Sequence, residues 1–63
     1  MDSKEQLLVN NLYRVESSYF VAGFETANGK VIRSAPILRR ILPIDEQKAI
    51  EAIRQKGWRI RRL

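Results

Sequence analysis

The segment from Tyr19 to Arg40, YFVAGFETANGKVIRSAPILRR, constrains the fold more than any other part of the chain. It contains the longest β-type run, Tyr19–Thr26, and then Asn28-Gly29, a dipeptide typical of tight hairpin turns. Pro36 is unsuited to a central strand but suits the first turn of a helix. The segment therefore predicts two antiparallel strands joined by a hairpin, with a change from strand to helix at Pro36.

The Asn28-Gly29 turn is compatible with two registers. A two-residue turn would place Phe24 opposite Arg33, whereas a three-residue loop with a bulge at Gly29 would place Phe24 opposite Ile32. Since a one-residue slip moves every side chain to the other face, the register with the more coherent apolar face is favoured. We therefore predict the bulged register. Its core face would consist of Tyr13, Val15, Phe20, Ala22, Phe24 and Ile32, and its opposite face of Arg14, Glu16, Tyr19, Val21, Glu25, Val31 and Arg33.

Residues 1–16 are expected to contain one further strand. Leu12–Glu16 alternates apolar and polar side chains, which predicts a strand that turns back through Ser17-Ser18. Residues 1–10 are expected to form a poorly ordered or short helical lead-in, and residues 11–63 a single domain. The pair Ser3 and Gln6 has the spacing of a capping box for such a helix.

The chain after Pro36 is expected to contain two short helices. The first would bury Ile37, Leu38, Ile41 and Leu42 and end at Pro43. Asp45 has the properties of an N-cap for the second helix, whose buried stripe would be Ala49, Ile50 and Ile53.

Gly57 is expected to end this second helix in a left-handed conformation, so that Trp58 folds back onto Ile53 as in a Schellman motif. The residues after it, Trp58–Leu63, would form a short last strand with Arg59 and Arg61 on one face. The predicted fold is α+β, in the order β-β-β-α-α-β. Three N-terminal strands and a fourth C-terminal strand form a small antiparallel sheet, and both helices lie on its Phe20/Phe24 face.

The composition excludes most kinds of catalytic site. The 63 residues include no cysteine and no histidine, which excludes disulfides, thiolate or imidazole metal ligands, and Ser/His or Cys/His nucleophile pairs. Asp45 and Glu46 are best explained as the start of a helix rather than as a metal site. We expect a non-enzymatic protein without cofactor or metal. The N-terminal residues show neither a signal peptide nor a membrane span, so a cytoplasmic protein is expected.

The net charge of +5 is concentrated in the second half of the chain. Residues 1–32 hold three basic and four acidic side chains, a net charge of −1, and residues 33–63 hold nine basic and three acidic ones, a net charge of +6. Such asymmetry favours an anionic partner, and arginine binds phosphate with two parallel donors. A solvated rim that protects an edge strand is the alternative. The candidate nucleic-acid-binding residues, for DNA or RNA, are Arg39, Arg40, Arg54, Lys56, Arg59, Arg61 and Arg62.

A second candidate surface is the predicted outer face of the sheet. An aromatic ring between arginines can stack on a base, or can form the centre of a protein interface. The residues concerned are Arg14, Tyr19, Val21, Val31 and Arg33. An ordinary solvated face with cross-strand charge pairs would have the same pattern. A protein partner, including a second copy of the chain, is therefore the alternative to nucleic acid.

The residues YRVESSYFVAGFETANGKVIRSAPIL, together with Gly57-Trp58, resemble a family of short phage- and prophage-encoded proteins. The shared pattern is YRV, then YF-AGF, NGKV and API-L. The resemblance implies a viral or prophage origin and a place in the host cytoplasm, but no particular activity. The charge asymmetry and the Arg59/Arg61 alternation favour a small nucleic-acid-binding protein. The phage-like resemblance, together with a domain too small for catalytic chemistry, favours the alternative, an adaptor or inhibitor of a host transcription or defence factor.

Overall fold

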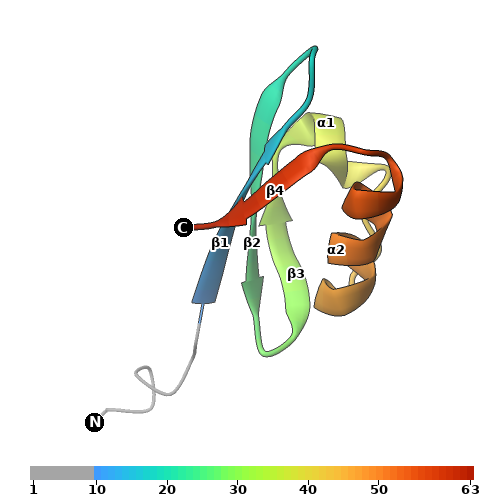
Figure 1. The fold of residues 1–63 in the computed structure, drawn as a ribbon. Coiled ribbons are helices and arrows are strands. Elements are labelled where there is room, and N and C mark those ends of the chain that lie inside the picture. Colours follow the sequence, from blue (N-terminus) through green and yellow to red (C-terminus); the bar gives the residue numbers. More distant parts are fainter. Residues whose placement is uncertain (1–9) are drawn as a thin grey trace, which may run out of the picture.

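The structure is a computed structural model that describes residues 10–63. These residues form a four-stranded antiparallel sheet with two short helices on one of its faces (Figure 1). The strand order is β3-β2-β1-β4, so the last strand returns to pair with the first. The predicted α+β fold and its element order are confirmed. The elements are β1 (Asn10–Glu16), β2 (Val21–Ala27), β3 (Lys30–Ser34), α1 (Pro36–Arg39), α2 (Glu46–Gln55) and β4 (Arg59–Arg62).

The predicted lead-in over residues 1–10, with its Ser3/Gln6 capping box, lies outside the described residues except for Asn10. Asn10 is the first residue of β1 and pairs with Ala27, so this strand begins two residues before the predicted Leu12.

The loop between β1 and β2 is longer than the predicted Ser17-Ser18 turn. Glu16 pairs with Val21, and the Ser17 amide donates to the carbonyl oxygen of Phe20 at 2.9 Å. The Ser17 hydroxyl also accepts the amides of Tyr19 and Phe20, at 3.0 and 3.2 Å. These amides are bound within the loop and are not available for strand pairing. The prediction that the strand begins at Tyr19 was therefore wrong by two residues.

The predicted register of β2 and β3 was also wrong. Asn28 and Gly29 both have positive φ, 54° and 78°, and form a tight two-residue turn that pairs Ala27 with Lys30. The irregularity lies further along, where the pairing shifts from Thr26–Val31 to Glu25–Arg33. Ile32 is the extra residue at this bulge.

The bulge exchanges the faces of two apolar residues. Val31 packs against the core, although it was predicted on the outer face, and Ile32 is 52% exposed, although it was predicted in the core. The sequence suggested a bulge, but it lies in the strand and not in the turn.

The helix α1 begins at Pro36, as predicted, and buries Leu38 completely. It has only four residues, so it buries one side of a single turn. Ile37 is 53% exposed, which corrects its predicted place in the buried stripe. The chain then runs beside the start of β3, where the Val31 amide donates to the Ile44 carbonyl at 2.7 Å. This contact covers part of the outer edge of the sheet.

The ends of α2 match the prediction. The Asp45 side chain accepts the Lys48 amide at 3.0 Å, which is the geometry of an N-cap. Gly57 has φ of +79°, its amide donates to the Arg54 carbonyl, and the Trp58 amide donates to the Ile53 carbonyl. These two bonds form the predicted Schellman motif.

The core lies between the sheet and the helices. Buried apolar side chains from β1 and β2 meet the buried residues of α1 and α2, and Phe20 and Trp58 close one end with their rings edge to face, 5.0 Å apart. The completely or almost completely buried apolar residues are Tyr13, Val15, Phe24, Leu38, Ala49 and Ile53.

Candidate functional site

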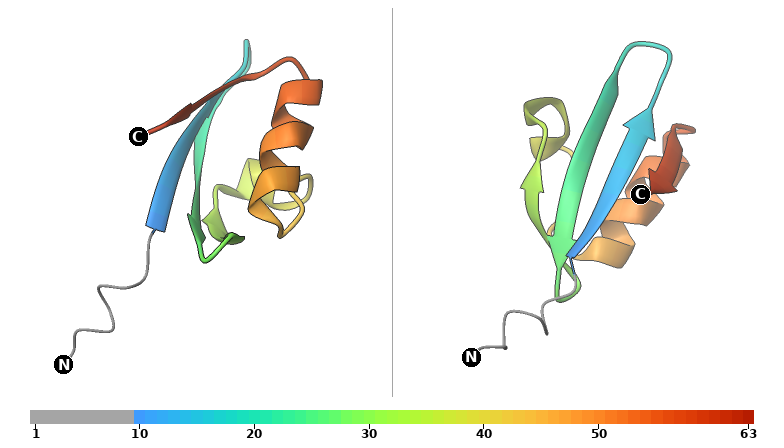
Figure 2. Two further views of the ribbon diagram at one scale, coloured as in Figure 1. Left: turned by 60° about the horizontal axis from the view of Figure 1, so that its bottom comes forward. Right: turned by 90° about the vertical axis from the view of Figure 1, so that its left-hand side faces the viewer.

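The face of the sheet turned away from the helices is uncovered in the described part of the chain, and we call it the open face. The right-hand view of Figure 2 looks onto it, with both helices behind the strands. Side chains on this face alternate along each strand with the buried ones. They are Asn10, Leu12, Arg14 and Glu16 on β1, Val21, Gly23, Glu25 and Ala27 on β2, Lys30 and Arg33 on β3, and Arg59 and Arg61 on β4.

The pairing of β1 with β4 gathers three arginines around one glutamate. Arg14 lies opposite Arg61, and Glu16 lies opposite Arg59. The Glu16 carboxylate contacts Arg14 Nε at 3.0 Å and Arg59 Nη1 at 4.0 Å. Like charges placed directly opposite one another in a sheet destabilise it. The fold therefore carries an electrostatic cost at the Arg14–Arg61 pair that Glu16 offsets only in part.

A second charge pair lies on the other side of the open face. Arg33 Nε is 3.8 Å from a Glu25 oxygen, and the Asn10 side-chain amide donates to the other Glu25 oxygen at 2.7 Å. Counting the strand residues named above, the open face holds four arginines, one lysine and two glutamates, a net charge of +3.

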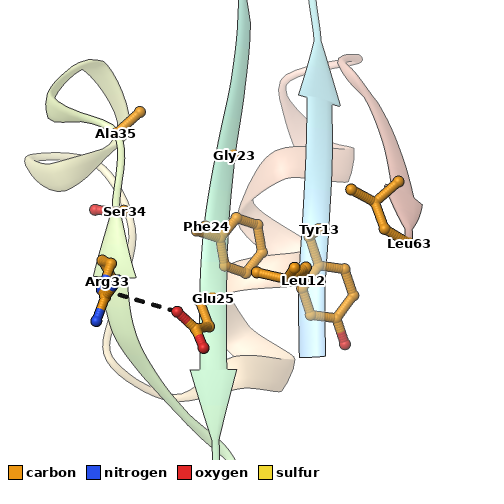
Figure 3. Close-up of a pocket in the computed structure, with 9 residues that line it drawn as sticks. All are labelled: Leu12, Tyr13, Gly23, Phe24, Glu25, Arg33, Ser34, Ala35 and Leu63. Carbon is orange, nitrogen blue, oxygen red and sulfur yellow. Dashed lines mark ion pairs between the residues drawn. The ribbon is translucent and has the colours of Figure 1, made fainter. Parts of the chain in front are cut away.

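Beside the Arg33–Glu25 pair lies an apolar groove of about 460 Å³ (Figure 3). Its floor is formed around Gly23, where the missing side chain leaves the backbone of β2 uncovered. Leu12 and Leu63 border one side, and Arg33 with Glu25 borders the other. Leu12 and Leu63 are 51% and 68% exposed. The groove could therefore accept an apolar group.

The structure separates the seven predicted nucleic-acid-binding residues. Only Arg59 and Arg61 lie on the open face. Arg62 pairs opposite Tyr13 and so lies on the helix side, near the Glu46 carboxylate described below.

The remaining predicted cations belong to the helices. Arg39 and Arg40 lie at the end of α1, and Arg54 in the last turn of α2. Lys56 Nζ lies over the Trp58 ring, 5.5 Å from its centroid. These four residues are therefore not part of the surface formed by β1 and β4.

Only part of the second predicted surface lies on the open face. Arg14, Val21 and Arg33 lie on the open face as expected. Tyr19 lies at the tip of the β1–β2 hairpin, and Val31 packs against the core, which takes it off the predicted outer face. The pairing that joins Arg14 to Arg61 was not predicted, because the sequence does not indicate which strand β4 pairs with.

A buried polar cluster was missed by the sequence analysis. Glu46, the first residue of α2, is 8% exposed, and its Oε2 accepts bonds from Tyr13 Oη at 2.5 Å, Thr26 Oγ1 at 3.0 Å and Asn11 Nδ2 at 3.2 Å. We call these four residues the Glu46 cluster. They tie the start of α2 to β1 and β2, since a buried carboxylate requires such partners.

The hydrogen bonds of the Glu46 cluster shift two pKa values in opposite directions. The bond from Tyr13, assisted by Thr26, Asn11 and the nearby Arg62, holds the pKa of Glu46 below its ordinary value, against the opposing effect of burial. Burial raises the pKa of Tyr13, and the bond to Glu46 raises it further. The cluster is explained by its contribution to the fold, and we assign it no part in binding.

In the described residues, no three acidic side chains come together in an arrangement that could hold a metal ion. None of the helices in this part of the chain is both long and apolar enough to span a membrane. Comparison with protein-family models, with curated proteins and with solved structures finds no match to this chain.

Proposed function

We propose that the protein binds nucleic acid through the arginines that β1 and β4 present on the open face. The observation that carries the proposal is the Arg14–Arg61 pair, two like charges directly opposite one another on an uncovered surface. One glutamate, Glu16, faces the three arginines of β1 and β4, so the Arg14–Arg61 repulsion is offset only within this group. A phosphate chain would relieve the repulsion and would accept donors from both guanidinium groups.

The geometry of the site supports a phosphate backbone rather than a small anion. Arg59 and Arg61 are two residues apart on one face of a strand, a separation of about 7 Å, which is close to the spacing of successive phosphates. Arg14 on the neighbouring strand widens this row. We also propose that the protein has a phage or prophage origin, acts in the host cytoplasm and has no enzymatic activity. These parts of the proposal rest on the sequence resemblance and on the composition.

Fluorescence anisotropy with labelled single-stranded and duplex DNA and RNA tests the proposal. We compare the wild type with a double variant, Arg14→Ala with Arg61→Ala, at about 50 and about 200 mM salt. The double variant should bind at least tenfold more weakly, and the slope of log affinity against log salt should fall by about two. The matched control is Arg39→Ala with Arg40→Ala, which removes two charges from the helix side.

Two results would contradict the proposal. One is the absence of wild-type binding at low salt. The other is an equal loss of affinity in the open-face double variant and in the control, which would indicate that net charge alone determines binding.

An adaptor or inhibitor that binds a host protein is the second candidate. The apolar groove over Gly23, bordered by exposed Leu12 and Leu63, favours it. In this case nuclease-treated host lysate should yield a stoichiometric partner that is lost with Leu12→Asp. Recovery of the same partner by the Leu12→Asp variant would contradict a role for the groove.

A further inference from the structure

The tip of the β1–β2 hairpin carries the most exposed large apolar side chain in the described residues. Tyr19 is 91% exposed, and the hairpin extends past the ends of β3 and β4 (Figure 1, Figure 2). The open face itself carries no aromatic side chain in the part that the structure describes. An aromatic ring that stacks on a nucleobase bound along this face would therefore come from the hairpin tip.

The loop that carries Tyr19 is held in place on both sides. The Ser17 hydroxyl accepts the amides of Tyr19 and Phe20, and the Ser17 amide donates to the Phe20 carbonyl. The Phe20 ring packs edge to face on Trp58. Since these contacts fix the residues before and after Tyr19, less backbone freedom is lost when its ring binds a partner.

A shallow hollow of about 290 Å³ lies beside this tip. It is lined by Glu16, Ser17, Ser18, Gly57 and Arg59. Arg59 has a side chain that is 78% exposed, and its 4.0 Å contact with Glu16 is at the limit of an ion pair, so its donors are available. The Ser17 hydroxyl oxygen already accepts two amides, which leaves its hydrogen free to donate to an anion.

From this juxtaposition we infer that the hairpin tip binds an unpaired nucleotide, with the Tyr19 ring stacked on the base and Arg59 bound to an adjacent phosphate. The inference rests on the proposed function and adds the class of nucleic acid, a single strand or an unpaired loop. A base inside a duplex has both of its faces covered by neighbouring bases. An aromatic ring on a protein surface can stack only on a base that is not stacked already.

The test uses a labelled single strand of about 12 nucleotides and an abasic strand of the same length and charge. The Tyr19→Ala variant should bind the normal strand roughly 5- to 150-fold more weakly, the range for the loss of one stacked base, and the abasic strand as the wild type does. Tyr19→Phe should stay within about twofold of wild type, because the ring is kept. Arg59→Ala should weaken binding to both strands.

The control variant is Ile44→Ala, which removes an exposed apolar side chain in the loop beside the start of β3, at the opposite end of the sheet from the β1–β2 loop. It should leave both affinities unchanged. Equal binding of the normal strand by Tyr19→Ala and wild type overturns the inference, and so does an equal loss on the abasic strand. If the open-face double variant loses affinity while Tyr19→Ala does not, only the inference fails. If the wild type binds no nucleic acid, the proposed function fails with it.

Discussion

Replacement of Glu46 by glutamine is the sharpest test of how the helices are fixed to the sheet. Glutamine has the same shape, but it has no charge and only one oxygen. The three donors that converge on Glu46 Oε2, from Tyr13, Thr26 and Asn11, would meet a weaker acceptor. Thr26 is completely buried, so its hydroxyl has no access to water as a substitute.

The expected loss of stability is large for a domain of this size. A hydrogen bond to a charged group contributes about 1.5–3 kcal/mol, and a neutral one about 0.5–1.5 kcal/mol. Because the amide still accepts, each of the three bonds should lose about 1–1.5 kcal/mol, or about 3–4.5 kcal/mol together. The neutral amide avoids the desolvation cost of the buried carboxylate, so we expect Glu46→Gln to lower the free energy of unfolding by about 2–3 kcal/mol. A 63-residue domain has a total of about 3–9 kcal/mol, so the variant would lose a substantial part of it.

The same cluster predicts how stability depends on pH. The folded-state pKa of Glu46 lies below its ordinary value of 4.5, so the contribution of the carboxylate is complete above pH 4.5 and is lost as the pH falls through the folded-state pKa. Tyr13 behaves in the opposite sense. Its pKa is raised from 10.0, so its contribution is complete below pH 10.0 and is lost as the pH rises through the folded-state pKa.

Urea denaturation followed by the fluorescence of Trp58, the single tryptophan, measures both effects. Glu46→Gln should lower the midpoint and flatten the acid limb of the stability curve. Glu51→Gln, an exposed glutamate in the same helix, should stay within about 0.5 kcal/mol of wild type. The reasoning is refuted if Glu46→Gln matches wild type, or if its acid limb is unchanged.

Three further predictions use the same denaturation assay. Gly57→Ala should cost about 1–2 kcal/mol, because φ of +79° strains any residue with a Cβ, and loss of less than 0.3 kcal/mol would contradict this. Asp45→Ala removes the N-cap bond to Lys48 and should cost about 0.5–2 kcal/mol, whereas Asp45→Asn should cost less. Arg61→Glu turns the like-charge pair with Arg14 into a pair of opposite charges, so the free energy of unfolding should rise by about 0.2–1 kcal/mol while nucleic-acid affinity falls. A variant that binds nucleic acid as tightly as wild type would contradict the proposed site.

The elements that the sequence predicted well are those determined by local chemistry. Asp45 and Gly57 fix the ends of α2 through contacts within a few residues, and Pro36 fixes the start of α1. The register of β2 and β3 was missed because Asn28-Gly29 can form either turn. The choice depends on whether Val31 or Ile32 fits against the core, which is a question of packing.

In the candidate site too, features set by local sequence could be predicted, and features set by pairing between distant segments could not. The alternation of Arg59 and Arg61 on one face follows from the period of a strand and could be read from the sequence. Their meeting with Arg14 depends on the pairing of β4 with β1, which no local pattern specifies. The Glu46 cluster was missed because a glutamate in the first turn of a helix normally faces water. Glu46 is buried because its carboxylate accepts hydrogen bonds from side chains on β1 and β2, which are distant in the sequence.

The return of β4 to β1 also affects the order in which the chain folds. The strands β1, β2 and β3 follow one another through short loops and can pair locally, whereas β4 must close a loop that contains residues 17–58. The Arg14–Arg61 repulsion and the Glu16–Arg59 attraction both form only in this last step, and salt screens both, so we expect the docking rate of β4 to change little with ionic strength. A polyanion bound to Arg14 and Arg61 would remove the repulsion and keep the attraction, and the binding partner would then act as a template for completing the sheet.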